Sequence, residues 1–324
     1  MNYRAPVFPA PQDWQYDPYG SNYNVGISAL FGQYIVTPTA RWIVTAGGRY
    51  DRLALDNSRV GGSTVNATFD AFSPKLSATF NVLDPGSSGK PVVHLYGTYS
   101  QAFLPPRRPS QLTPTTASLD LKPEDISNYE GGIKAGFAGG RLSMEAAYFD
   151  MVRDGIVTTV RQGPFFIPSN AGQQRFKGVE TGAHWATPRL SLFANASFYH
   201  NRFGTYVIES SGGDTVLTGN RLPIAPDTVL NSGGTVTLNH GVTVTANVKR
   251  IGAVALDQIN SVTLPGYTVV DAAVTWRRGP VRITLSSHNL LNAEYYWNGD
   301  TSIGESADPG RPRQLLVSTS VVLK

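Results

Sequence analysis

The sequence contains no cysteine among its 324 residues. This absence excludes disulfide scaffolds, thiolate metal sites and cysteine nucleophiles. Long apolar runs are missing too, because no stretch reaches the roughly 18 apolar residues that a transmembrane helix needs. Residues 1–14 lack a basic start followed by an apolar run, so they do not resemble a secretory signal peptide.

Charged residues make up only 15% of the sequence, against a usual share of about 25%. The net charge of +4 is modest and no block of basic residues occurs, so we expect no nucleic-acid partner. The mean hydropathy of -0.17 resembles that of a soluble protein. It is equally compatible with a membrane β-barrel, because the strands of such a barrel alternate apolar and polar residues.

The patterns expected of a catalytic or metal site are also missing. No histidine has a metal-ligand spacing such as H-E-x-x-H. No G-x-S-x-G motif marks a serine nucleophile, and no nucleophile is paired with a base. We therefore expect no enzyme, no catalytic residues, no protein-bound metal and no cofactor of its own. The five dispersed histidines are His94, His184, His200, His240 and His288.

What the sequence does contain is a two-residue alternation of apolar and polar side chains. It is clear between Arg41 and Arg52 and recurs along the chain, which predicts about thirteen strands. In this first example one face carries Trp42, Val44, Ala46 and Tyr50, and the other carries Arg41, Thr45, Arg49 and Asp51. The alternation alone also suits a soluble β-sandwich with one solvated face, so that alternative stays open.

The predicted strand lengths favour a membrane barrel, because they reach about 10 to 13 residues whereas strands average about five or six. Connections also alternate between short and long, as periplasmic turns and external loops do in outer-membrane barrels. The short ones are predicted near 37–40, 83–91, 139–140, 188–189, 239–241 and 277–280. The long ones are predicted near 53–68, 104–125, 155–175, 204–228, 252–266 and 290–312. We expect an all-β fold, a transmembrane antiparallel β-barrel.

The charged residues of the strands need a polar environment, since a basic side chain facing the bilayer centre costs about 2–4 kcal/mol. We expect them to face a wet lumen or a plug. These lumen-facing or plug-facing residues are Arg49, Glu130, Lys134, Glu180, Lys249 and Arg282. The chain divides into an irregular N-terminal segment, 1–22, and one barrel domain, 23–324, in which no plug domain is recognised.

A series of short motifs follows the same order as the strands. They are FGQYIVTPTARWIVTAGGRYDR (31–52), FSPKLSATF (72–80), LYGTYSQAFLPP (95–106), LKPEDISNYEGGIK (121–134), NAGQQRFKGVE (170–180), GNRLPIAP (219–226), LPGYTVVDAAV (264–274), NLLNAEYYW (289–297) and GRPRQ (310–314). As an ordered set they resemble the C-terminal part of the β-barrel of TonB-dependent outer-membrane receptors, of the siderophore-receptor type.

The resemblance implies a fold and a function. Family barrels have about 22 strands, and this sequence resembles roughly the last thirteen. The implied function is an outer-membrane receptor and transporter for iron–siderophore complexes in the bacterial outer membrane. Action through the TonB complex requires a plug and a TonB box from further sequence. The alternative is a passive barrel or pore, or a non-transporting structural fragment.

The resemblance also directs attention to external loops, where arginine and tyrosine suit anionic ferric siderophores. Iron would enter only as part of such a ligand. The competing interpretation is that basic loop residues bind lipopolysaccharide phosphates and outer-membrane lipids, with aromatic residues at the interface. The ligand-binding candidates are Arg107, Arg108, Tyr206, Arg221, Tyr295, Tyr296 and Trp297.

Overall fold

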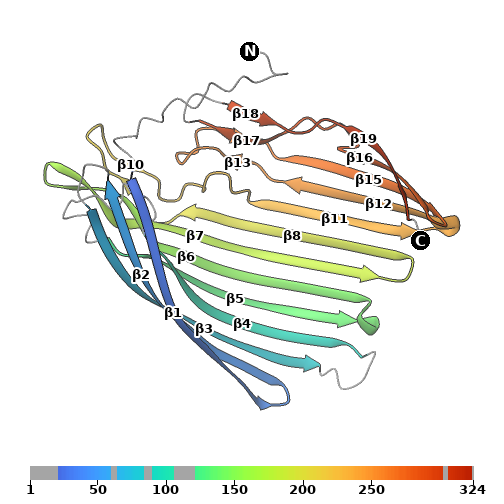
Figure 1. Cartoon of the computed structure of the whole chain (residues 1–324), viewed down its shortest axis with the longest axis horizontal. Helices are drawn as coiled ribbons and strands as arrows, with labels where there is room; N and C mark the ends of the chain where they lie inside the picture. The colour runs from blue at the N-terminus through green and yellow to red at the C-terminus, as the bar shows by residue number, and fades with distance from the viewer. Residues whose placement is uncertain (1–20, 60–63, 84–89, 106–120, 302–305, 323–324) are drawn as a thin grey trace.

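The computed structural model describes residues 21–59, 64–83, 90–105, 121–301 and 306–322. One antiparallel sheet of 13 strands dominates it, and its strands lie side by side in chain order (Figure 1). The strands are β1 (Ser21–Thr39), β2 (Trp42–Arg59), β3 (Thr64–Leu83), β4 (Val92–Leu104), β5 (Glu124–Phe137), β6 (Leu142–Gln162), β7 (Phe165–Ala186), β8 (Leu190–Phe203), β11 (Thr228–Thr237), β12 (Val242–Ile251), β15 (Tyr267–Arg278), β16 (Val281–His288) and β19 (Gln314–Val321). The predicted number of strands is confirmed.

The two ends of the sheet differ. At one end, on the right of Figure 1, strands are joined by tight turns, two of which contain the 3-10 turns η2 (Ala138–Gly140) and η3 (Asn239–Gly241). Gly139, with φ of 67°, and His240, with φ of 60°, take the left-handed conformation that reverses the chain there. Among the described residues, no helix is long and apolar enough to cross a membrane.

At the opposite end the connections are long, and three of them contain small two-stranded sheets. These are β9 (Val207–Ile208) with β10 (Thr215–Val216), β13 (Val254–Ala255) with β14 (Thr263–Leu264), and β17 (Tyr296–Asp300) with β18 (Ser306–Pro309). The long connections predicted near 204–228, 252–266 and 290–312 are confirmed. That near 104–125 falls between β4 and β5, and most of it lies outside the described residues.

Two predicted loops are wrong. The segments near 53–68 and 155–175 are largely strand, because β2 and β3 extend toward each other and β6 and β7 meet in a hairpin. The register of β6 with β7 shifts around Ile156, which interrupts the alternation without ending the pairing. These strands therefore reach 18 to 22 residues rather than the predicted length. Ser21 and Asn22 also belong to β1, whereas residues 1–20 lie outside the described part.

The alternation places apolar and polar residues on opposite faces of the sheet, as predicted. On the apolar face Trp42 and Tyr50 are 43% and 45% exposed, and Trp42 packs against Phe80 with ring centroids 4.8 Å apart. No described second sheet covers this face. A soluble sandwich would bury such residues between two layers, so the exposed apolar face argues against that alternative.

Hydrophobic packing is found instead among the long connections. The largest described cluster consists of Ile156, Phe203, Tyr206, Leu217 and Leu222. Leu217 has no exposed surface, so the loop between β8 and β11 packs against Ile156 of β6 and Phe203 of β8 through a buried core. We call this group the loop core.

Candidate functional site: the polar face of the sheet

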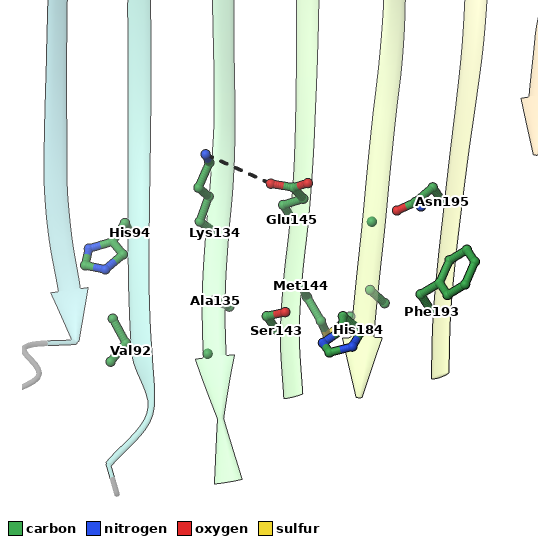
Figure 2. A pocket seen from close by; sticks show the side chains of 13 residues that line it. Val92, His94, Lys134, Ala135, Ser143, Met144, Glu145, His184, Phe193 and Asn195 are labelled. Carbon is green, nitrogen blue, oxygen red and sulfur yellow. Dashed lines mark ion pairs between the residues drawn. The ribbon is translucent and has the colours of Figure 1, made fainter. Parts of the chain in front are cut away.

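A hollow of about 480 Å³ lies on the polar face across β4 to β8 (Figure 2). Gly136 and Gly182 lie along it and contribute no side chains, which leaves the space open. His94, Lys134 and Glu145 lie around it, from three consecutive strands that pair in register at this level. The hollow is therefore a consequence of glycine positions within a regular ladder.

A second hollow of about 370 Å³ adjoins the first and shares Lys134 and Glu145 with it. It brings Glu130 and Glu180 to the same surface. We call Glu130, Glu145 and Glu180 the acidic wall. Three carboxylates face one ammonium group there, so the surface suits a cationic partner.

Hydrogen bonds orient two of the three carboxylates. The Tyr96 hydroxyl donates to Glu130 Oε1 at 2.8 Å, and the Tyr199 hydroxyl donates to Glu180 Oε1 at 2.7 Å. The ammonium of Lys134 lies 4.0 Å from Glu145 Oε2, and both side chains are more than half exposed. An exposed pair at that distance contributes little, so the carboxylates stay available to a further cation.

The two histidines of the first hollow have neighbours of their own. His94 Nδ1 is 2.7 Å from Asn81 Oδ1, and His184 Nε2 is 3.2 Å from Ser191 Oγ. Within the described residues no group of three or more histidine, aspartate or glutamate side chains could hold a metal ion.

The pairing registers place all the predicted lumen-facing residues on this one polar face. Arg49 is paired with Asp51 at 2.7 Å. Lys249 lies opposite Asn231, and Arg282 lies opposite Ser320. Their contact with a plug remains a prediction. These residues are Arg49, Glu130, Lys134, Glu180, Lys249 and Arg282.

The external-loop candidates divide into two groups. The ring of Tyr206 belongs to the loop core, and only 9% of this residue is exposed. Arg221 donates to the Ala253 carbonyl at 2.6 Å and pairs with Asp227 at 3.1 Å. Both side chains therefore join loop segments to each other, which removes them from the exposed surface that a ligand meets first.

The other loop candidates are more accessible. Tyr296 and Trp297 of β17 are 47% and 59% exposed, while Tyr295 stacks on Tyr267 with ring centroids 4.4 Å apart. Arg107 and Arg108 lie outside the described residues. The exposed aromatic pair is thus the part of the predicted ligand set that the structure leaves open to solvent.

The loop between β8 and β11 is also tied to the β6–β7 hairpin. The Thr158 hydroxyl donates to the Val207 carbonyl at 3.2 Å, and the Glu209 amide donates to the Thr159 carbonyl at 3.1 Å. Ile156 adds an apolar contact through the loop core. The hairpin and the loop therefore form one packed unit.

Sequence reasoning missed Tyr96 and Tyr199, which orient the acidic wall. Aromatic residues were expected at interfacial girdles, whereas both of these lie on the polar face. The position of each within its strand was the available signal. Tyr96 is two residues from His94, and Tyr199 is two residues from Ser197, so each shares a face with a polar residue.

A long-stranded sheet with an exposed apolar face, a charged opposite face, tight turns at one end and long connections at the other defines a class, the membrane-spanning β-barrel. Residues 1–292 match the family described as "TonB dependent receptor-like, beta-barrel". The chain belongs to this family. The resemblance seen in the ordered motifs is confirmed, and so is the antiparallel barrel fold.

Curated relatives are receptors of siderophores and related metal carriers. The chain is 25% identical over 280 residues to the ferrioxamine receptor of Yersinia enterocolitica, covering 81% of this chain and 37% of the relative. It is 23% identical over 339 residues to the metal-pseudopaline receptor CntO of Pseudomonas aeruginosa, covering 99% of this chain and 44% of the relative. The chain thus spans less than half the length of these relatives.

Solved structures agree on the fold. The siderophore receptor PiuA of Acinetobacter baumannii superposes with a TM-score of 0.80 at 19% identity, covering 93% of this chain and 44% of that one. The ferric citrate transporter FecA superposes with a TM-score of 0.72 at 17% identity, covering 93% and 45%. The family and these neighbours are transport receptors and not enzymes, as expected from the sequence.

Proposed function

We propose that this chain forms barrel wall and external loops of a receptor in the bacterial outer membrane that takes up ferric siderophores or similar metal chelates. The observation that carries the proposal is the family match over residues 1–292, together with relatives named for ferrioxamine and metal–pseudopaline. Iron enters only within the ligand, and the chain itself needs no cofactor.

The ligand first meets the exposed aromatic residues of the external loops. Tyr296 and Trp297 on β17 offer flat, half-exposed rings, which suit the organic part of a siderophore complex. Arg107 and Arg108 of the connection after β4 are proposed to contact its anionic groups.

The acidic wall is proposed to receive basic side chains of a plug domain in the whole receptor. Glu130 and Glu180 are held in place by tyrosine hydroxyls, which reduces the cost of ordering them when a cation binds. Coupling to the TonB complex would then act through that plug. Coupling of this kind separates a receptor from a passive pore.

Lipid partners are proposed for the outer, apolar face. The Arg175 guanidinium binds the Asp150 carboxylate there, and Lys177 lies opposite both Asp150 and His200. Tyr148 and Phe198 are half-exposed on the same face, where both lie opposite Val179, two residues along β7 from Lys177. Cations next to aromatic residues at a membrane interface suit the phosphates of lipopolysaccharide.

The test is uptake of iron-55 as ferric ferrioxamine B by receptor-deficient cells that express the receptor containing this chain. Uptake should require TonB, and Trp297→Ala should lower the affinity about ten-fold or more if the ring anchors the ligand. Trp276→Ala, which changes an outer-face tryptophan beside a tight turn, is the control and should leave uptake unchanged. A steady ion current in planar bilayers without TonB, and no uptake, would instead favour the passive pore.

A further inference from the structure

A separate hollow of about 490 Å³ lies on the polar face across β1 to β4. It shares no lining residue with the hollows of the acidic wall. Its lining combines the apolar side chains of Phe31 and Pro74 with polar and basic ones, among them Gln33, Thr45, Arg49, Ser73 and Lys75. We call it the basic hollow.

The lining of the basic hollow includes Gly47, a glycine between two longer side chains. Gly47 pairs with Gln33 on β1 and with Lys75 on β3, so the three residues form one row across the sheet. A Cβ atom at Gly47 would meet the Gln33 Cβ at 3.0 Å and the Gly32 carbonyl oxygen at 3.1 Å. The glycine therefore avoids crowding against Gln33 and adds no side chain to the hollow.

The charge of the hollow is not balanced within the described residues. Arg49 binds Asp51 through Nε and Nη2 at 2.7 to 2.9 Å, and the Asp51 side chain is only 5% exposed. A guanidinium has five N–H donors, and the described contacts of Arg49 leave Nη1 unused. No described carboxylate lies within ion-pair distance of the exposed Lys75 ammonium, so one positive charge is left over.

Arg49 and Lys75 are diagonal neighbours on paired strands, a relation that separates Cβ atoms by about 7–8 Å. A carboxylate between them could accept from both side chains, because each charge-assisted hydrogen bond spans about 2.8 Å. The hydroxyls of Thr45 and Ser73 supply further donors around the same space.

We propose that the basic hollow is an anion subsite that binds a carboxylate group inside the barrel. Two sources carry this chemistry: an aspartate or glutamate side chain of a polypeptide packed in the lumen, or a carboxylate-bearing metal chelate passing along the wall. The acidic wall, on the same face, has the opposite preference. The subsite is a property of the wall and does not require the proposed loop ligand.

The absence of cysteine allows the two surfaces to be probed one thiol at a time. Thr45→Cys places a thiol in the basic hollow, and Ser197→Cys places one in the acidic wall hollow. In the full chain in detergent micelles, each thiol reacts with an anionic sulfonatoethyl and a cationic trimethylammonioethyl methanethiosulfonate, and each rate is divided by that of free glutathione. The anionic-to-cationic ratio should be about five-fold higher at position 45 than at position 197.

Lys75→Gln should lower the ratio at position 45 about three-fold, whereas Lys75→Arg should keep it. Lys249→Gln is the matched control, because Lys249 is an exposed lysine on the same polar face outside the hollow. Lys75→Arg also controls for folding, since it preserves charge at the same position. Equal ratios at positions 45 and 197, or a ratio indifferent to Lys75→Gln, would overturn the proposal.

Protection experiments then identify the source of the carboxylate. Citrate at millimolar concentration should slow modification of the thiol at position 45 if a small chelate fits the hollow. A tetraglutamate peptide should do so if the hollow receives acidic side chains. Protection by either supports the subsite and names its occupant, and protection by neither contradicts it.

Discussion

The wall of the barrel and its external loops are stabilised in different ways. The wall is held by continuous strand pairing, and its apolar face stays open in the described structure, with half-exposed residues such as Trp42 and Tyr129. The loop between β8 and β11 instead has the loop core, with Leu217 fully buried. The difference indicates that this loop is ordered by apolar packing against the ends of β6 and β8, whereas the wall is ordered by backbone pairing.

The largest effect should come from the loop core. Leu217→Ala removes a fully buried side chain, which costs about 2–5 kcal/mol. Hydrogen exchange should rise across residues 204–227 and in the part of the β6–β7 hairpin that packs on the loop core, while the other strands of the sheet stay protected. Val216→Ala is the control, because Val216 is 63% exposed. Exchange that rises in the loop and the whole sheet together would show that the two regions are one cooperative unit.

A second test changes the wall and leaves the loops intact. Gly132→Val should cost about 1–3 kcal/mol, because a Cβ atom there would meet the Ala146 carbonyl oxygen at 2.6 Å and the Tyr96 ring at 2.7 Å. Gly136→Val, four residues along the same strand, should be tolerated since nothing lies within 4 Å of its Cβ position. Unfolding by guanidinium in micelles measures the free energy of unfolding of both variants. If Gly136→Val lost as much stability as Gly132→Val, steric crowding at Gly132 would not explain the loss.

A smaller change is expected from the hydrogen bonds of the acidic wall. Tyr199→Phe removes the hydroxyl that donates to Glu180 and should cost about 1 kcal/mol or less. Tyr148→Phe, on the opposite face, serves as the comparison. If both variants unfold at the same denaturant concentration as the parent, the hydrogen bond orients Glu180 without stabilising the wall.

The smallest effect concerns pH in the connection between β12 and β15. Burial would raise the pKa of Asp257, but the amides of Val262 and Ser261 and the Ser261 hydroxyl outweigh it and lower the pKa below the usual 3.8. The carboxylate therefore stabilises this loop above pH 3.8, and the contribution is lost as pH falls through the lowered pKa.

Hydrogen exchange across residues 252–266, measured between neutral and acidic pH, tests this. The parent loop should loosen at the acidic end of the range, whereas Asp257→Asn should show no such step in that loop. The wall should be unaffected in both proteins. An acid-induced step of the same size in the Asn variant would assign the effect to other groups.

Alternation was enough to predict the faces of the wall, because side chains of a strand point to opposite sides and Trp42 cannot share a face with Arg49. It failed at 155–175, where Gly155 and the register shift near Ile156 interrupt the period while the pairing continues. It failed at 53–68 as well, where the β2–β3 pairing continues without a shift as far as Ser58 and Thr64. The buried place of Tyr206 was not predictable, since the loop core joins residues from β6, β8 and the loop that are distant in sequence.

The ties between β9 and β6 have a mechanical consequence. Because Thr158 and Thr159 of the hairpin bind Val207 and Glu209 of the loop, and Ile156 packs into the same cluster, a push on either segment displaces the other. The β6–β7 hairpin and the loop form one packed unit at the end of the barrel that carries the long connections. A rearrangement on that side of the barrel would therefore move the hairpin and the loop together, unless it broke these contacts.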